Sequence, residues 1–356
     1  MSVGVVIVNY NCARLSFDAA SSVLADDPSA KIIIVDNAST DDSRAYFQSV
    51  LSEGSDHTPA SPDLDAAPWL RTFAPNFVSV ADVQTVHVEA DDQNSMPIDE
   101  TASLVILYAN ENNGFAAGSN IGLNFLRARF SCDVYLLLNP DALVGAGAIA
   151  AFRERLADKS IGLCGGSIIR FENPTIFQSC GGAQLHPLTL LGKNISGEMS
   201  TRDLPGVSAV EDKLDYPLGA AIALRADYLE TVGLLDERFF LYYEEIDWAF
   251  RGKGKYRCGW ASAAAVYHRH GASAGSRIRA RVRSPIADYH MIRSRLLFAL
   301  RWRPLLVPLL VLFSLLQSLR RGLRGHGAQA RSVLRATADF ARRPAVIVKP
   351  EIPATK

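Results

Sequence analysis

The sequence predicts an α/β fold in which helices flank a mostly parallel β-sheet. Residues 3–8 and 31–35 are apolar, β-branched runs, which are typical of strands buried on both faces. A helical segment at 15–24 lies between them, so these residues describe a βαβ unit. A third apolar run, 134–138, ends at Asn139-Pro140-Asp141, where proline cannot continue a central strand. The Asp141 carboxylate is therefore expected at the carboxyl rim of the sheet, where open α/β folds bind ligands.

The remaining elements continue this alternation of strands and helices. The polar cluster at 36–42 predicts a turn that leads into a helix, and 52–102 is rich in Ser, Asp and Pro and predicts a partly irregular insertion. Within it, 78–88 could form a short strand or hairpin. We expect further strands at 104–107, 161–169, 216–224 and 257–266, helices at 123–130, 148–156, 226–233 and 244–252, and a hairpin within 171–215.

The charge of the chain is unevenly distributed. Hydrophobic residues make up 48% and charged residues 21% of the 356, as in a globular protein with a sizeable core. Residues 277–356 carry 17 Lys+Arg and three Asp+Glu, whereas residues 1–276 carry 20 and 34. We therefore expect a main domain at 1–275 and a basic, helical region at 276–356 with an anionic partner, either a membrane surface or a nucleic acid.

Cysteine usage and the N-terminus indicate a cytoplasmic protein. The five cysteines are scattered, odd in number and without CxxC spacing, which argues against a disulfide framework or a zinc site. The chain opens on an apolar strand with no basic leader, so no signal peptide is expected.

The C-terminal region contains an apolar helical pattern that favours membrane contact. Residues 296–316 are apolar but interrupted by arginines and prolines, and the uncharged part, 304–319, is about 16 residues long, short of the roughly 20 that span a bilayer. Arginines flank it on both sides, which suits an interfacial segment on an anionic membrane. The alternative is packing on the body or on a second subunit. An apolar core without interleaved aromatics favours lipid, so no nucleic acid is expected.

Polar groups at two strand ends suggest a nucleotide site. Asp36 ends the second strand, and Asn9 and Tyr10 end the first. Asp36 could accept the imide N–H of uracil or thymine, or it could be a helix N-cap. The small residues that follow Asn113 and Gly114 open a helix, where backbone amides favour a phosphate, although this signal alone is weak.

Two further groups could carry chemistry. His268 follows the last strand, and with Asp141 on the same rim it becomes a credible pair of metal ligands. Glu244, Glu245 and Asp247 place three carboxylates close together, which raises at least one pKa and suits a general base. The alternative is a solvated helix start, where the helix dipole favours acidic residues.

Taken in order, these pieces resemble a known family. The chain is similar to bacterial family 2 inverting glycosyltransferases of the GT-A fold, in particular the rhamnosyltransferase-like branch. The resemblance covers about residues 3–51 and 103–303. The matching segments are 5–11, 35–41, 113–120, 138–141, 219–221, 233–240, 243–247 and His268.

The resemblance implies a role for each motif. Asp36, with Asn9 and Tyr10, would bind the pyrimidine base. Asn139 to Asp141 resembles the DxD element with Asn in place of the first acid, and Asp141 and His268 would hold Mg²⁺ or Mn²⁺. Glu245 would be the catalytic base, with Asp247 as the alternative. In the same reading, the donor contacts are Asn113, Gly114, Asn139, Gly219 and Ala220, and the acceptor contacts are Asp236 and Glu244.

The resemblance implies a metal-dependent transferase that is peripheral on the inner face of the bacterial cytoplasmic membrane. Its donor would be dTDP-rhamnose or a UDP-sugar, and its acceptor a lipid-linked or polysaccharide glycan. Two other functions remain open: a non-catalytic nucleotide-sugar or glycan-binding protein, and a sugar nucleotidyltransferase. The nucleotidyltransferase is disfavoured because no glycine-rich basic loop follows the first strand.

Overall fold

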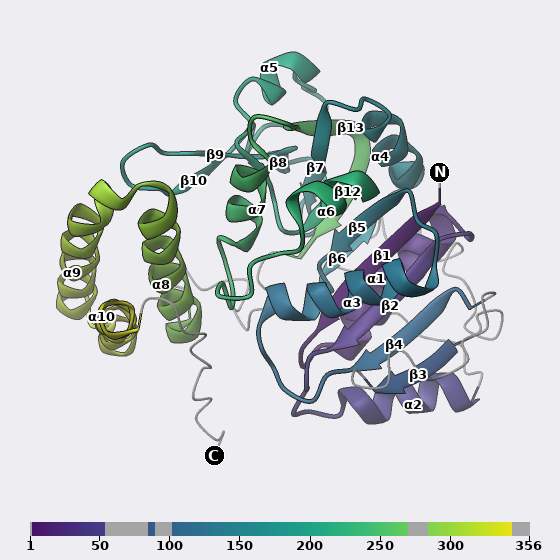
Figure 1. Ribbon diagram of the computed structural model, residues 1–356, viewed down its shortest axis with the longest axis horizontal. Helices are drawn as coiled ribbons and strands as arrows, with labels where there is room; N and C mark the ends of the chain where they lie inside the picture. Colours follow the sequence, from purple (N-terminus) through teal and green to yellow (C-terminus); the bar gives the residue numbers. More distant parts are fainter. Residues whose placement is uncertain (1, 54–84, 90–101, 270–283, 344–356) are drawn as a thin grey trace.

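The computed structural model describes residues 2–53, 85–89, 102–269 and 284–343. A ten-stranded mixed sheet runs through these residues in the order β3-β4-β2-β1-β5-β12-β7-β13-β6, with β8 paired to β7. A small sheet, β10-β9-β11, lies beside it, and helices cover both faces of the main sheet (Figure 1). The predicted α/β architecture with a mostly parallel sheet is confirmed.

The elements have the following bounds. The strands are β1 (Val3–Asn9), β2 (Lys31–Asp36), β3 (Thr85–Glu89), β4 (Leu104–Tyr108), β5 (Val134–Leu138), β6 (Ala142–Val144), β7 (Ile161–Arg170), β8 (Phe177–Cys180), β9 (Gly182–Leu185), β10 (Gly192–Asn194), β11 (Tyr216–Pro217), β12 (Ala221–Arg225) and β13 (Arg257–His268). The helices are α1 (Ala13–Asp26), α2 (Ser43–Glu53), α3 (Phe115–Arg129), α4 (Ala148–Leu156), α5 (Val207–Glu211), α6 (Ala226–Val232), α7 (Glu244–Gly252), α8 (Pro285–Trp302), α9 (Val307–Leu323) and α10 (Gly327–Arg342).

Strand direction gathers many chain segments at one rim of the sheet. β1 pairs in parallel with β2 and β5, and β2 pairs in parallel with β4. β12 runs antiparallel between β5 and β7, so its first residues lie where β5 ends. β13 is parallel to β7 and therefore ends at the same rim. β3 is parallel to β4, so the carboxyl ends of seven strands and the start of β12 meet along one edge, as the sequence predicted for Asp141.

The core is divided by the sheet into two apolar layers. Alternate side chains of β1 enter opposite layers: Val5 and Ile7 pack with α1, α2 and α4, and Val6 and Val8 pack with α3. Helix α3 lies so close to the sheet that a Cβ at Gly118 would lie only 2.7 Å from the Val8 side chain. The small residues of this helix therefore serve helix–sheet packing.

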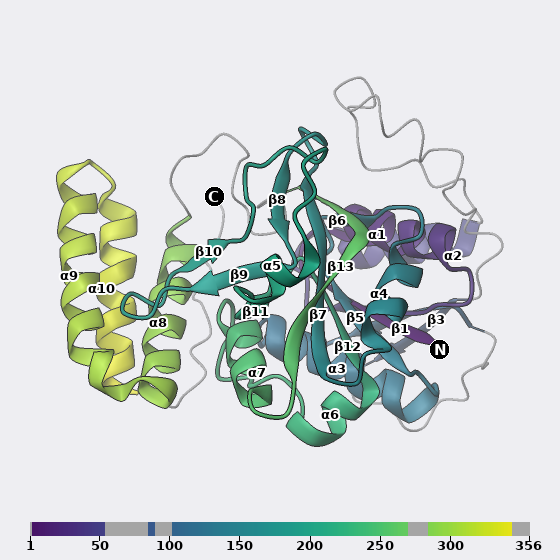
Figure 2. The ribbon, with the colours of Figure 1, turned by 90° about the horizontal axis from the view of Figure 1, so that it is seen from above.

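The C-terminal helices α8, α9 and α10 stand beside the sheet on the side of α7 (Figures 1 and 2). Helix α8 is capped by the Ser284 hydroxyl, which accepts the Ala287 N–H at 3.2 Å. Its residues Leu296 and Phe298 are fully buried in the same apolar layer as α3, α6 and α7. Helix α8 is therefore integrated into the body, while the expected boundary between 275 and 276 lies outside the described residues.

Most predicted elements are found, and the differences have physical causes. The bounds predicted for α4 and α7 match, and β9 and β10 form a hairpin within 171–215. The single strand predicted at 216–224 is two strands in different sheets, because the chain turns between β11 and β12. Helix α3 starts at Phe115, earlier than predicted, and β6 was missed because three residues show no period. Of the 52–102 insertion, α2 takes the first two residues and β3 pairs in parallel with β4; most of the rest lies outside the described residues.

Candidate active site

The strand register brings Asn9 and Asp36 together at the rim. They are paired residues of β1 and β2, and the Asn9 amide donates to Asp36 Oδ1 at 2.7 Å. The Ser39 hydroxyl donates to the same oxygen, and Asp36 is 4% exposed. Helix α2 begins only at Ser43, so Asp36 is not its N-cap. Tyr10 follows β1 and is half-buried beside this pair.

The loop before α3 continues the site but uses its glycine differently from the expectation. The Asn37 amide donates to the Gly114 carbonyl at 3.1 Å. Gly114 has φ +94°, and a Cβ there would lie 2.2 Å from the Phe240 carbonyl oxygen. Phe115 donates its N–H to that same oxygen at 2.8 Å. Gly114 therefore permits the close approach of the Phe240 backbone, and Asn113 lies half-buried next to it.

Asp141 and His268 meet at the rim. His268 pairs with Ala142 across β13 and β6, and the separation between His268 Nε2 and Asp141 Oδ1 is 3.3 Å. Both side chains are buried. His268 Nδ1 lies 2.9 Å from Gln178 Oε1 on β8. With Nδ1 as the donor to Gln178, Nε2 keeps its lone pair toward Asp141, as a ligating imidazole requires. Sequence reasoning missed Gln178, since it stands in a stretch without a motif.

This pair fits a hard divalent cation. Among the described residues, no group of three or more His, Cys, Asp or Glu side chains converges. Two protein ligands suit Mg²⁺ or Mn²⁺, because such ions usually keep water and substrate phosphate oxygens as their other ligands. The carboxylate suits either ion, whereas the imidazole favours Mn²⁺, which is a transition metal.

Gly219 and Ala220 lie next to the Asp141–His268 pair. The Asn139 N–H donates to the Ala220 carbonyl at 3.0 Å, and Ala221 pairs with Leu138. A Cβ at Gly219 would meet nothing within 4 Å, so this residue borders open space. The turn between β11 and β12 thus forms one wall at the rim beside Asp141.

Glu244 and Glu245 form a pair of carboxylates at the start of α7. Glu244 is 5% exposed, Glu245 is partly exposed, and the Oε2 atom of each is buried without a hydrogen-bond partner. Burial and the charge of Glu245 raise the pKa of Glu244 well above its usual range, and burial raises the pKa of Glu245 to about 7. Tyr242 and Tyr243 just before them have φ of 67° and 69°, a left-handed conformation that is costly for tyrosine.

Two neighbours tie this pair to the rim. Burial and the charge of Glu245 raise the pKa of the Tyr216 phenol, so that carboxylate lies near β11, just ahead of Gly219. Phe240, which precedes the pair, accepts the Phe115 N–H at the start of α3. The carboxylate pair, the turn before β12 and the loop before α3 therefore adjoin one another at the same side of the sheet.

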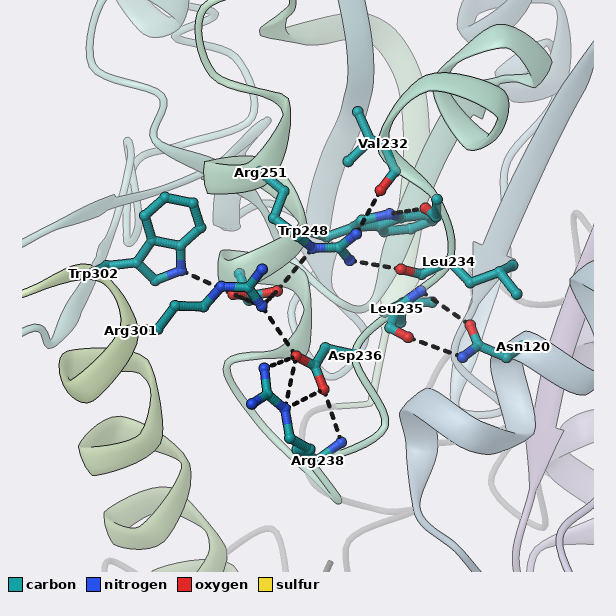
Figure 3. Close-up of polar contacts among 12 residues, drawn as sticks. Asn120, Val232, Leu234, Leu235, Asp236, Arg238, Trp248, Arg251, Arg301 and Trp302 are labelled. Atoms are coloured by element: carbon teal, nitrogen blue, oxygen red, sulfur yellow. Dashed lines mark hydrogen bonds and ion pairs between the residues drawn. The ribbon is translucent and has the colours of Figure 1, made fainter. Parts of the chain in front are cut away.

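Asp247 and Asp236 have protein partners, and Figure 3 shows Asp236 between Arg238 and Arg301. Asp247 is fully buried; its Oδ2 accepts from Arg251 at 2.9 Å and its Oδ1 from the Trp302 indole N–H at 2.8 Å. Arg301 lies 3.3 Å from Asp247 Oδ1 and 3.0 Å from Asp236 Oδ2. Asp236 is also bound by the Arg238 guanidinium. The carboxylate predicted as the alternative base and the one predicted to contact the acceptor are thus both ion-paired to arginines.

Sequence reasoning also missed the contribution of α8. The His290 ring stacks on Phe240, with centroids 4.5 Å apart, and the Ser294 hydroxyl donates to the Leu241 carbonyl at 2.9 Å. Arg293 donates to the Arg238 carbonyl at 3.4 Å. These residues recur at the i, i+3 and i+4 spacing of one helix face, a signal that was present in the sequence.

Comparison with known proteins gives one curated relative and several solved structures. No family model matches the sequence. The low-salt glycan biosynthesis hexosyltransferase Agl10 of Haloferax volcanii is 24% identical over 144 residues, which cover 40% of this chain and 44% of that protein. GalNAc-T7, solved with UDP, GalNAc and Mn²⁺, has a TM-score of 0.50 and 12% identity over 97% of this chain and 57% of its own. The mannosyltransferase PcManGT of Pyrobaculum calidifontis, solved with GDP-Man and Mn²⁺, has a TM-score of 0.46 and 16% identity over 99% and 76%.

The likeness to GalNAc-T7 shows that the fold is that of GT-A glycosyltransferases. At these identities the structural likeness concerns the fold alone. The matched part of the chain spans less than half the length of the curated relative.

The carboxylate pair should make stability depend on pH. Because the pKa of Glu245 is raised on folding, its contribution is present below the usual glutamate range and is lost as pH rises through about 7. Glu245→Gln should therefore stabilise the protein relative to wild type by more than about 1 kcal/mol at about pH 8, and by less at about pH 5. Urea unfolding at both values measures this, with Glu230→Gln as the exposed control. An equal effect of Glu245→Gln at both values would contradict the raised pKa.

Proposed function

We propose that this protein is a metal-dependent inverting glycosyltransferase, similar to the bacterial family 2, rhamnosyltransferase-like enzymes. It transfers a sugar, with rhamnose favoured, from a nucleoside diphosphate donor to a hydroxyl group of a lipid-linked or polysaccharide acceptor. The observation that carries the proposal is the presence of two sets of groups on one side of a GT-A fold. These are the Asp141–His268 pair and the buried Glu244–Glu245 pair.

The donor base is assigned to the end of β2. Asp36 is buried, and Asn9 and Ser39 hold its carboxylate in place at the rim. A carboxylate there can accept the imide N–H of thymine or uracil, and Tyr10 adjoins it. This supports dTDP-rhamnose or a UDP-sugar as the donor, because both bases carry that N–H.

The diphosphate is assigned to the turn after β5. Asp141 and His268 would hold Mg²⁺ or Mn²⁺, which supplies positive charge as the nucleoside diphosphate departs. Asn139 and the turn at Gly219 and Ala220 lie beside them and would border the donor sugar.

Glu245 is assigned as the base. A carboxylate with a pKa of about 7 removes a proton well near neutral pH. It takes the proton of the acceptor hydroxyl while that oxygen attacks the anomeric carbon and the bond from this carbon to the diphosphate oxygen breaks. One displacement of this kind inverts the configuration. Glu244, whose pKa is raised well above its usual range by burial and by the charge of Glu245, stands on the acceptor side.

The same pair separates catalysis from binding alone. The Oε2 atom of each glutamate is buried without a hydrogen-bond partner, which is unfavourable for folding, and groups with perturbed pKa values of this kind cluster at catalytic sites. Asp247 is a weaker candidate for the base, since Arg251, Arg301 and Trp302 occupy its oxygens.

Asp141→Ala should abolish the use of metal. We expect wild type to bind Mn²⁺ together with the matching nucleoside diphosphate and to release that diphosphate from one donor in a panel of nucleotide-sugars. The variant should lose Mn²⁺ binding, measured by calorimetry, along with turnover. Asp203→Ala, which removes an exposed carboxylate elsewhere, should behave as wild type. Full Mn²⁺ binding by Asp141→Ala would refute the assignment of the ligands.

Glu245→Gln should lower kcat by about 10²–10⁴-fold while the Kd of the donor stays near the wild-type value, because only proton removal is lost. In wild type, kcat should rise with pH through about 7, as the base ionises. Steady-state rates across this range and donor titrations check both. A Glu245→Gln variant with wild-type kcat would show that another residue is the base.

We further propose that α9 docks on the inner face of the cytoplasmic membrane. The side of α9 that faces the body of the protein is formed by Leu310, Ser314 and Ser318, which are buried. The opposite face carries a row of leucines at 309, 312, 316, 319 and 323, between 50% and 81% exposed. Leucines outside and serines inside reverse the usual arrangement of a helix in a soluble protein, so this face suits an apolar partner.

The charges around α9 support a peripheral position. By length and composition, Pro304–Leu323 could cross a membrane. This segment is longer than the uncharged stretch 304–319 expected from the sequence, because the helix continues through Arg320 and Arg321. However, Arg321 pairs with Asp288 of α8, and Arg295 donates to Ser314 at 3.0 Å. The inner side is thus tied to charged groups of the body, and only the outer leucines are available to lipid. Exposed arginines at both ends, Arg303 and Arg320, complement anionic headgroups.

Replacing outer leucines should release the protein from lipid. We expect wild type to sediment with phosphatidylglycerol-containing vesicles, and Leu312→Gln with Leu316→Gln to weaken this by about 10-fold or more. Leu204→Gln is the matched control, because Leu204 and Leu312 are each 54% exposed. Added salt should weaken wild-type binding. A dimer in light scattering that the double variant dissociates, without vesicle binding, would instead identify a second copy as the partner.

A further inference from the structure

The start of α7 has few stabilising contacts within its own first turn. Its N-cap residue, Tyr243, provides no side-chain hydrogen bond to the helix and has φ 69°. Its first turn contains Glu244, Glu245 and Asp247, whose like charges repel. Such a conformation persists only where surrounding structure enforces it.

The enforcing contacts come from a helix distant in sequence. Asp247 donates its N–H to the Tyr243 carbonyl at 2.9 Å, so it closes the first turn of α7. Its carboxylate is then held by Trp302 and Arg301 at the last turn of α8 (Figure 3). Arg251, one turn further along α7, holds the same carboxylate.

The same network reaches the loop that leads into α7. Arg251 donates to the carbonyls of Val232 and Leu234, at 2.7 and 2.6 Å (Figure 3). Arg301 also binds Asp236 in that loop. The depth and rotation of the first turn of α7 are therefore set from both sides of Asp247.

We propose that Asp247, held by Arg301 and Trp302, is a positioning residue that places the Glu244 and Glu245 carboxylates for the reaction. It acts through the first turn of α7 and does not touch the substrate. The inference rests on the proposed function for its catalytic consequence, while the placement of the pair can be measured without turnover.

Trp302→Phe and Arg301→Gln test this in the full chain. Phenylalanine keeps a ring near Phe250, whose centroid lies 5.6 Å from that of Trp302, but loses the N–H that Asp247 accepts. Both variants should lower kcat by about 10-fold with little change in KM, since a small displacement of a catalytic group slows the chemical step. Arg301→Lys, which keeps the charge, should recover part of the loss.

The second readout is independent of activity. Carbon-13 NMR of labelled glutamate carboxyls, assigned with Glu244→Gln and Glu245→Gln, follows the titration of the pair. The groups that face it are the other carboxylate of the pair and the Tyr216 phenol. In Trp302→Phe and Arg301→Gln the titration should move toward ordinary glutamate values as water reaches the loosened turn. Arg303→Gln, whose guanidinium donates to the Trp302 carbonyl, is the matched control.

The outcomes separate the two proposals. An unchanged titration in both folded variants overturns the positioning role, whatever the activity of wild type. A shifted titration together with a wild type that releases no nucleoside diphosphate supports the positioning role and refutes the proposed function. A shifted titration with reduced kcat supports both.

Discussion

The common direction of strands β1, β2, β4, β5, β7 and β13 is the constraint on which the rest of the structure depends. Parallel strands end at the same edge, so the side chains that follow them are gathered there although they lie far apart in the sequence. Asn9 meets Asp36 in this way, as successive strands of a βαβ unit. β13 extends the same edge, and its pairing with β6 places His268 against Asp141.

The acidic residues of α7 show how packing gives neighbouring carboxylates different environments. Asp247 faces two arginines and an indole, and it becomes part of the fold. Glu244 and Glu245, on the same helical turn, are buried without such partners, and burial raises their pKa values. One short segment therefore yields a structural ion pair and a pair of carboxylates suited to proton transfer.

The C-terminal helices α8 and α9 have different surroundings. Helix α8 holds the loop before α7 through His290, Arg293 and Ser294, and it lies in the core of the body. Helix α9 turns serines inward and leucines outward, which suits a lipid surface. Helix α8 of the basic region thus packs against the loop before α7, although composition separates this region from the body.

The sequence by itself determined most of the strands, the polar residues at their ends, and the bounds of α4 and α7, because hydrophobic period and turn residues act locally. It also placed Asp36, Asp141 and His268 on one rim, since strand direction follows from alternating strands and helices. Only the tertiary structure decided the partner of each side chain. Gly114 meets Phe240, Gln178 orients His268, and Trp302 holds Asp247, although each pair is separated by more than 50 residues. Such environments depend on the packing of distant elements, which no local pattern records.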